Sequence, residues 1–165
     1  MAKAKTKYGV FEGEAFYARV FEQNIDDSEY HEDTQGQYNM MFVPKDQAEL
    51  DKMLSLGFPE SSMGHPMVKP IQAADNRLGM KLKRNNVDKT GIADFGGAPV
   101  VTKGKTNDEW SFTEDGAVGN GSKVLVKLSI YGEGARASVR LERVGVLELV
   151  PWEEGVGSGS AKDSW

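Results

Sequence analysis

The sequence contains no cysteine and only two histidines among its 165 residues. It therefore has no disulfide framework, no thiolate metal site and no thiol nucleophile, which fits a protein of the reducing cytoplasm. His31 and His65 are isolated from each other. His31 adjoins two acidic residues in a polar segment, where a hydrated side chain is more common than a metal ligand. We expect no metal site and no cofactor.

Long hydrophobic runs and catalytic motifs are also missing. No apolar segment approaches the roughly 18 residues of a membrane span, and the basic start of the chain has no hydrophobic region behind it to form a signal peptide. The glycine-rich segments at 116–123 and 132–137 lack the lysine–serine order and the following helix of nucleotide-binding loops, and neither HExxH nor GxSxG occurs. We expect a non-enzymatic cytoplasmic protein with no catalytic residue and no membrane partner.

Positive charge is in deficit, with 20 Lys plus Arg against 25 Asp plus Glu and a net charge of -5. This balance counts against a protein that coats duplex DNA, whose surface is usually strongly basic. The charges are nevertheless segregated along the chain. Acidic residues gather between 22 and 33, where a solvated surface is the ordinary interpretation, whereas basic residues gather between 69 and 89 and in the segment 119–152.

Short strands, glycine-rich turns and one helix predict a mainly β protein. We expect strands at 14–23, 35–44, 79–84 and 98–103, a helix between the N-cap Asp46 and Gly57, and loops at 58–76 and 85–97. A five-stranded, partly open barrel of the oligonucleotide-binding (OB) type, with one inserted helix and a long C-terminal hairpin, fits this order, and a β-sandwich is the alternative. Residues 1–152 would form one domain, followed by a flexible polar tail, 153–165.

Residues 119–152 are interpreted as that long antiparallel hairpin. In its first arm the aliphatic residues alternate with polar ones, so one face is expected to be buried. The core face comprises Val124, Val126, Leu128 and Ile130. If the chain reverses at 132–135, Tyr131 lies opposite Arg136 and Lys127 lies opposite Arg140. The alternation changes phase at 142–144, which predicts a bulge that bends the strand and favours the barrel.

The outward face of this hairpin brings an exposed aromatic residue next to several cations. Like charges placed directly opposite each other destabilise a sheet unless an anion lies over them. Aromatic rings for bases and Lys or Arg for phosphates are the means by which proteins hold single-stranded nucleic acid, so we expect Tyr131 to stack on bases. The candidate nucleic-acid-binding residues are Tyr131, Lys123, Lys127, Arg136, Arg140, Arg19, Tyr17, Lys81, Lys83, Arg84 and Trp152.

Several segments together carry a resemblance: PVVTKGK (99–105), NGSKVLVKLSIY (120–131), GARASVRLERVGVLELV (134–150) and the final Trp165, with GEAFYARVF and QGQYNMMFVP near the N-terminus. In this order they resemble the replication single-stranded-DNA-binding proteins of tailed bacteriophages. The resemblance implies an OB barrel with an inserted helix and no catalysis. It also implies sequence-independent coating and protection of single-stranded DNA during phage DNA replication, recombination and repair in the bacterial host cytoplasm.

In that family an acidic C-terminal tail with an aromatic last residue recruits replication enzymes. The tail of this chain is short, and Asp163 and Trp165 are the residues that would contact phage or host replication proteins. Exposed edges of an open barrel would also allow a homodimer. Two alternatives stay open: a β-rich phage structural or assembly protein that binds an acidic protein surface, and an RNA-binding OB fold, which a contact to the 2′-hydroxyl would favour.

Overall fold

A computed structural model describes residues 6–62, 64–87, 96–132, 134 and 137–150 of the chain. Seven strands form one sheet in the order β5-β6-β2-β1-β8-β9-β7, and every neighbouring pair is antiparallel except β7 with β9. The strands are β1 (Thr6–Arg19), β2 (Gln37–Pro44), β5 (Lys69–Ile71), β6 (Arg77–Asn85), β7 (Val100–Lys103), β8 (Ser122–Tyr131) and β9 (Ser138–Glu148).

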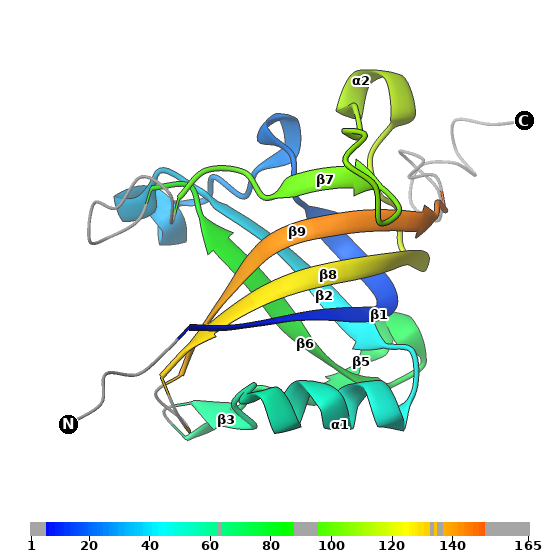
Figure 1. The fold of residues 1–165 in the computed structure, drawn as a ribbon. Helices are drawn as coiled ribbons and strands as arrows, with labels where there is room; N and C mark the ends of the chain where they lie inside the picture. The colour runs from blue at the N-terminus through cyan, green and yellow to red at the C-terminus, as the bar shows by residue number, and fades with distance from the viewer. Residues whose placement is uncertain (1–5, 63, 88–95, 133, 135–136, 151–165) are drawn as a thin grey trace, which may run out of the picture.

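The sheet curves on itself, so that β1, β8 and β9 lie in front of β2 and β6 in Figure 1. The strand order leaves β6 and β9 unpaired with each other, and an ion pair from Arg84 to Glu142, at 3.3 Å, spans between them instead. The expected fold class, a mainly β and partly open barrel of OB type, is confirmed. The sheet has seven strands because β5 and β7 extend the edges of the five long ones.

The core lies between the two halves of the curved sheet and follows the alternation predicted for β8. Its four expected core residues, Val124 to Ile130 at every second position, are fully buried. They pack with Leu141, Val144 and Val146 of β9 and with aromatic residues from β1 and β2. Removing each such side chain from water contributes about 1.5 to 3 kcal/mol, so the inward face of β8 holds the hairpin against the core.

Helix α1 (Gln47–Leu56) lies beneath the barrel (Figure 1). The carboxylate of Asp46 accepts a hydrogen bond from the backbone N–H of Glu49 at 2.9 Å, and Gly57 ends the helix with a φ of 120°. Both predicted ends of the helix are therefore confirmed. A second helix, α2 (Phe112–Asp115), begins after the cap Ser111; its four residues are too few to produce a helical periodicity that sequence reasoning could detect.

The hairpin register differs from the prediction by two residues between the turn and the bulge, and by three residues beyond the bulge. Tyr131 pairs with Ser138, not with Arg136, and Lys127 pairs with Arg143, not with Arg140. The connection spans residues 132–137 and is longer than the predicted reversal. A shift of two residues leaves every side chain on its predicted face, which is why the alternation could not determine the register. The predicted bulge is confirmed. Leu128 pairs with Leu141 but the neighbouring Lys127 pairs with Arg143, so Glu142 of β9 has no partner on β8.

Strand β1 begins earlier than predicted, at Thr6 instead of at residue 14, and it ends at Arg19. Its first half lacks an aliphatic run but pairs continuously with β8. Gly13 has no side chain where β1 meets β2, and a Cβ there would collide with the carbonyl oxygen of Val43. The glycine that weakens the sequence signal is thus what allows the two strands to approach.

Two connections between strands contain short regular elements. The connection from β1 to β2 has two 3-10 turns, Glu22–Asn24 and Glu29–Thr34. The predicted loop 58–76 contains a two-stranded sheet of β3 (Ser61–Ser62) with β4 (His65–Pro66), then β5 and a 3-10 turn, Gln72–Ala74. These elements contain too few residues for the periodicity of a helix or of a strand to appear in the sequence.

The guanidinium of Arg77 links β6 to β1 through two hydrogen bonds to the carboxylate of Glu14, at 3.1 and 2.9 Å. This bond lowers the pKa of Glu14 below its usual value, so its contribution to stability is present at neutral pH and is lost as the pH falls through the lowered pKa. We predict that Glu14→Gln lowers the free energy of unfolding by about 1 kcal/mol at pH 7.

Urea unfolding at pH 7 and at pH 3 tests this prediction, with Glu29→Gln on an exposed 3-10 turn as the control. The difference between Glu14→Gln and wild type should shrink at the lower pH, because the stability that comes from the lowered pKa is lost progressively as the pH falls. A difference of the same size at both pH values would contradict the assignment.

Candidate nucleic-acid interface

Two exposed tyrosines lie side by side on the outward face of β1 and β8. Thr6 pairs with Tyr131 and Tyr8 pairs with Ser129, so the two tyrosines are diagonal neighbours, a separation that aromatic side chains can span. Tyr8 is 60% exposed and Tyr131 is 53% exposed. Sequence reasoning missed Tyr8, whose only signal is its place in the alternation of a strand that was not predicted.

Two cations lie opposite each other next to these rings. The Lys127 ammonium lies 5.4 Å from the centroid of the Tyr8 ring, and Lys127 pairs across the strands with Arg143. Among the described residues neither cation forms an ion pair with a carboxylate; Arg143 donates a hydrogen bond to the carbonyl of Thr106 at 3.4 Å. We call the surface formed by Tyr8, Tyr131, Lys127 and Arg143 the hairpin face.

Two further predicted cations of the hairpin have carboxylate neighbours. The Lys123 ammonium lies 3.4 Å from Glu148, and the Arg140 guanidinium lies 3.7 Å from Glu142. The opposed like charges of the hairpin are therefore Lys127 with Arg143. Sequence reasoning missed Arg143 because the bulge at Glu142 brings it opposite Lys127.

Arg84 is buried, with 8% exposure, unlike the other predicted cations of β6. Its guanidinium donates to the carbonyls of Gly96 and Gly97, at 3.0 and 2.9 Å, and to Glu142 at 3.3 Å. The same carboxylate accepts a hydrogen bond from Ser129 at 2.8 Å. Because its donors are used inside the molecule, Arg84 has a structural role, and we remove it from the candidate interface.

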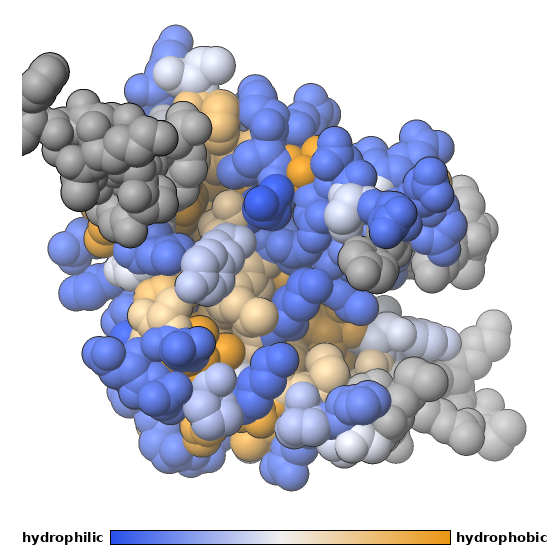
Figure 2. Space-filling view, turned by 180° about the vertical axis from the view of Figure 1, so that it is seen from behind, coloured by the Kyte–Doolittle hydropathy of each residue, from blue (hydrophilic) through white to orange (hydrophobic). Residues whose placement is uncertain are grey.

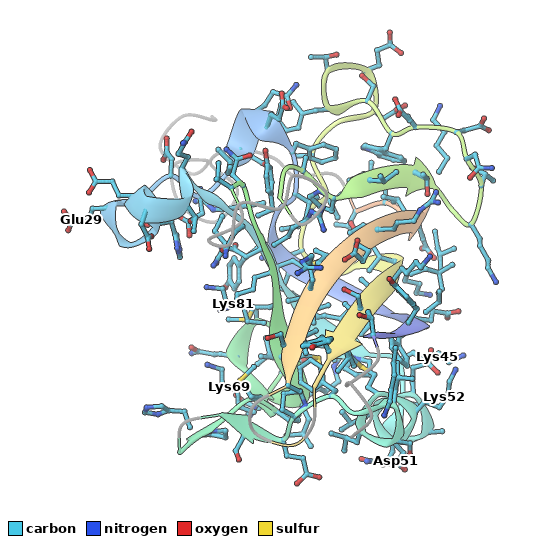
Figure 3. All side chains as sticks on the ribbon, turned by 60° about the vertical axis from the view of Figure 1, so that its left-hand side comes forward. Glu29, Lys45, Asp51, Lys52, Lys69 and Lys81 are labelled. Atoms are coloured by element: carbon cyan, nitrogen blue, oxygen red, sulfur yellow. The ribbon has the colours of Figure 1, made fainter. Side chains whose placement is uncertain are left out.

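Lys81 and Lys83 form a second basic group, on the outward face of β6 opposite Met41 and Asn39 of β2. Burial and the neighbouring Lys83 ammonium lower the pKa of Lys81, whereas Asp26 acts in the opposite sense. Figure 3 shows Lys81 on the same side of the molecule as Lys69 and away from Lys45 and Lys52. From behind, apolar atoms gather at the centre of the molecule with hydrophilic residues around them (Figure 2).

Tyr17 and Arg19 lie at the end of β1, far from the tyrosine pair. The strand bulges between Phe16 and Arg19, and Tyr17 takes the left-handed conformation with a φ of 52° and 62% of its surface exposed. The side chain of Asn120 holds this bulge by accepting from the N–H of Tyr17 at 2.8 Å. Since β8 ends beside Thr6 and begins beside Ala15, Tyr17 and Tyr131 belong to opposite ends of the sheet and form no single platform.

The remaining predicted site residues, Arg136, Trp152, Asp163 and Trp165, lie outside the described part of the chain. Within that part, no helix is both long and apolar enough to cross a bilayer, and no cluster of three or more acidic, histidine or cysteine side chains could hold a metal ion.

No protein-family model and no curated protein matches this chain. Among solved structures, the single-stranded DNA-binding protein from bacteriophage Enc34 matches with a TM-score of 0.53 and 14% identity, over 95% of this chain and 90% of that one. A C-terminally truncated form of that protein gives a TM-score of 0.51 at 12% identity, over 89% and 88% of the two chains. These matches over most of both chains show a shared fold. At the level of the fold, they support the resemblance that the sequence predicts.

The buried position of Arg84 generates a stability prediction. Arg84→Ala should lower the free energy of unfolding by about 2 to 3 kcal/mol, because two carbonyls and a carboxylate lose a charged donor. Lys83→Ala, on the same strand but exposed, should change it by no more than about 0.5 kcal/mol. Chemical denaturation measures both values, and equal effects of the two substitutions would contradict a structural role for Arg84.

Proposed function

We propose that this protein binds single-stranded DNA without sequence preference, through the hairpin face. The observation that supports the proposal is a pair of exposed tyrosines, Tyr8 and Tyr131, beside two opposed cations that have no described carboxylate partner. The fold that the chain shares with a phage single-stranded DNA-binding protein is consistent with this function.

In the proposed mode, successive bases stack on the two tyrosine rings while Lys127 and Arg143 contact the phosphates between them. Every base presents an aromatic face, so stacking tolerates any sequence. An anion over Lys127 and Arg143 also relieves their mutual repulsion, which gives the backbone of the strand a defined place on the sheet. No step of this mode requires a cofactor, a metal ion or a chemical reaction.

The second basic group has a supporting role in the proposal. Lys81, Lys83 and Arg19, with Tyr17 beside them, would contact DNA that extends beyond the hairpin face. The nearby Asp26 weakens the positive field there, so we assign the stronger contacts to the hairpin face. Coating of DNA during phage replication, recombination and repair, recruitment of replication proteins by Asp163 and Trp165, and a homodimer remain predictions.

Loss of either ring should weaken binding without unfolding the protein. We predict that Tyr8→Ala and Tyr131→Ala each reduce the affinity for a thymidine oligomer by about 1 to 3 kcal/mol, the free energy of stacking one base. Tyr8→Phe and Tyr131→Phe keep the ring and should bind like wild type. Fluorescence polarisation with a labelled oligomer measures the affinities, and Tyr17→Ala serves as the comparison at the far end of β1.

If both alanine variants on the hairpin face bind like wild type while Tyr17→Ala binds weakly, the site lies at the end of β1 that carries Tyr17 and Arg19, and the proposed face is wrong.

Binding should also depend steeply on salt. For single strands, the logarithm of the association constant falls by about 0.7 for each tenfold rise in salt and each phosphate that the protein neutralises. We predict a slope that corresponds to at least about two neutralised phosphates. We also predict weaker binding to a duplex than to a single strand of the same length. A titration at several salt concentrations that shows no slope, or a preference for duplex, would contradict the proposal. Indifference to every oligonucleotide would favour a partner with an acidic protein surface.

A further inference from the structure

A turn formed by residues 103–107 lies directly against the hairpin face. The N–H of Gly104 donates to the carbonyl of Val146 at 2.8 Å, and the hydroxyl of Thr102 donates to the carbonyl of Gly104 at 2.9 Å. Gly145 makes this approach possible, since a Cβ at that position would collide with the carbonyl oxygen of Gly104. The turn is therefore held in a fixed place on β9.

Between this turn and β8 lies a pocket of about 230 Å³. Val10 and Leu125 contribute apolar side chains to it, and Lys105, Lys127 and Arg143 contribute three cations. The hydrogen bond from Arg143 to the carbonyl of Thr106 connects the two walls. Within the described residues none of the three cations forms an ion pair, so the pocket combines an apolar surface with unneutralised positive charge.

We propose that this pocket binds one phosphodiester group of single-stranded DNA together with its deoxyribose, an inference that rests on the proposed function. The phosphate would lie between Lys127, Arg143 and Lys105, and the sugar would pack on Val10 and Leu125. The pocket is smaller than the roughly 300 Å³ at which pockets for drug-sized ligands begin, so it fits a phosphate and a sugar and leaves the base outside.

The geometry connects the pocket to the stacking residues. Lys127 lines the pocket and at the same time lies over the ring of Tyr8, so the base attached to a sugar in the pocket reaches that ring first. The apolar side chains also discriminate between sugars. In this placement a ribose would set its 2′-hydroxyl against the side chains of Val10 and Leu125, which offer it no hydrogen bond and displace part of its water. The pocket therefore favours DNA over RNA.

Charge-neutralising variants test the phosphate contact. Lys105→Gln and Arg143→Gln should each lower the affinity for a thymidine oligomer several-fold and reduce the salt slope by about 0.7. Lys45→Gln removes the same charge from an exposed residue that does not line the pocket, and it should leave the slope close to that of wild type. Among the described residues, the Lys105 side chain forms no hydrogen bond and no ion pair. Its variant therefore reports on binding even if Arg143→Gln alters the turn.

A sugar comparison tests the apolar surface. Oligodeoxyuridine should bind wild type at least about fivefold more tightly than oligouridine of equal length, since the two differ only at the 2′-position. Leu125→Ser, which supplies a hydroxyl partner, should narrow that ratio. Equal affinities of wild type for the two oligomers would overturn the placement of the sugar.

Failure of this inference and failure of the proposed function give different results. If wild type does not bind any single-stranded oligomer, the proposed function is wrong. If wild type binds and depends on Tyr8 and Tyr131, while Lys105→Gln and Arg143→Gln behave like Lys45→Gln, only the pocket assignment is overturned.

Discussion

The pairing of Lys127 with Arg143 on adjacent strands is the feature on which this interpretation depends. Like charges in directly opposed positions destabilise a sheet, and the described residues supply no carboxylate to separate these two. The strands stay together because the residues beneath them, Val126 and Val144, are fully buried and paired in the core. The inward face of the hairpin thus stabilises an outward face that would be unfavourable alone, and an anion bound there would add to the stability of the folded state.

The bulge at Glu142 joins this surface to the closure of the barrel. Because of this extra residue, Lys127 lies opposite Arg143 and not opposite a residue closer to the hairpin turn. The carboxylate of Glu142 in turn accepts from Arg84 of β6 and from Ser129 of β8, so one residue of β9 connects two strands, β9 and β6, that do not pair with each other. Bulges commonly bend strands and redirect side chains near functional sites, and both effects occur here at one position.

Much of the architecture could be predicted from the sequence, because period-two alternation in β8 and capping residues around α1 are local signals. The register of the hairpin could not, since a shift of two residues conserves every face. Tyr8 was missed because β1 begins in a segment with charged residues and glycines, whose strand conformation depends on pairing with β8. Arg84 was misassigned for a related reason: the sequence shows a cation in a basic strand and does not show that its partner, Glu142, lies 58 residues away.

The repulsion between Lys127 and Arg143 can be measured by a double-mutant cycle of Lys127→Gln and Arg143→Gln, as free energies of unfolding with and without a saturating thymidine oligomer. We expect the two cations to interact unfavourably in the free protein, and bound DNA to remove this repulsion or reverse its sign. A coupling free energy that is zero or favourable in the free protein, and unchanged by the oligomer, would contradict this interpretation.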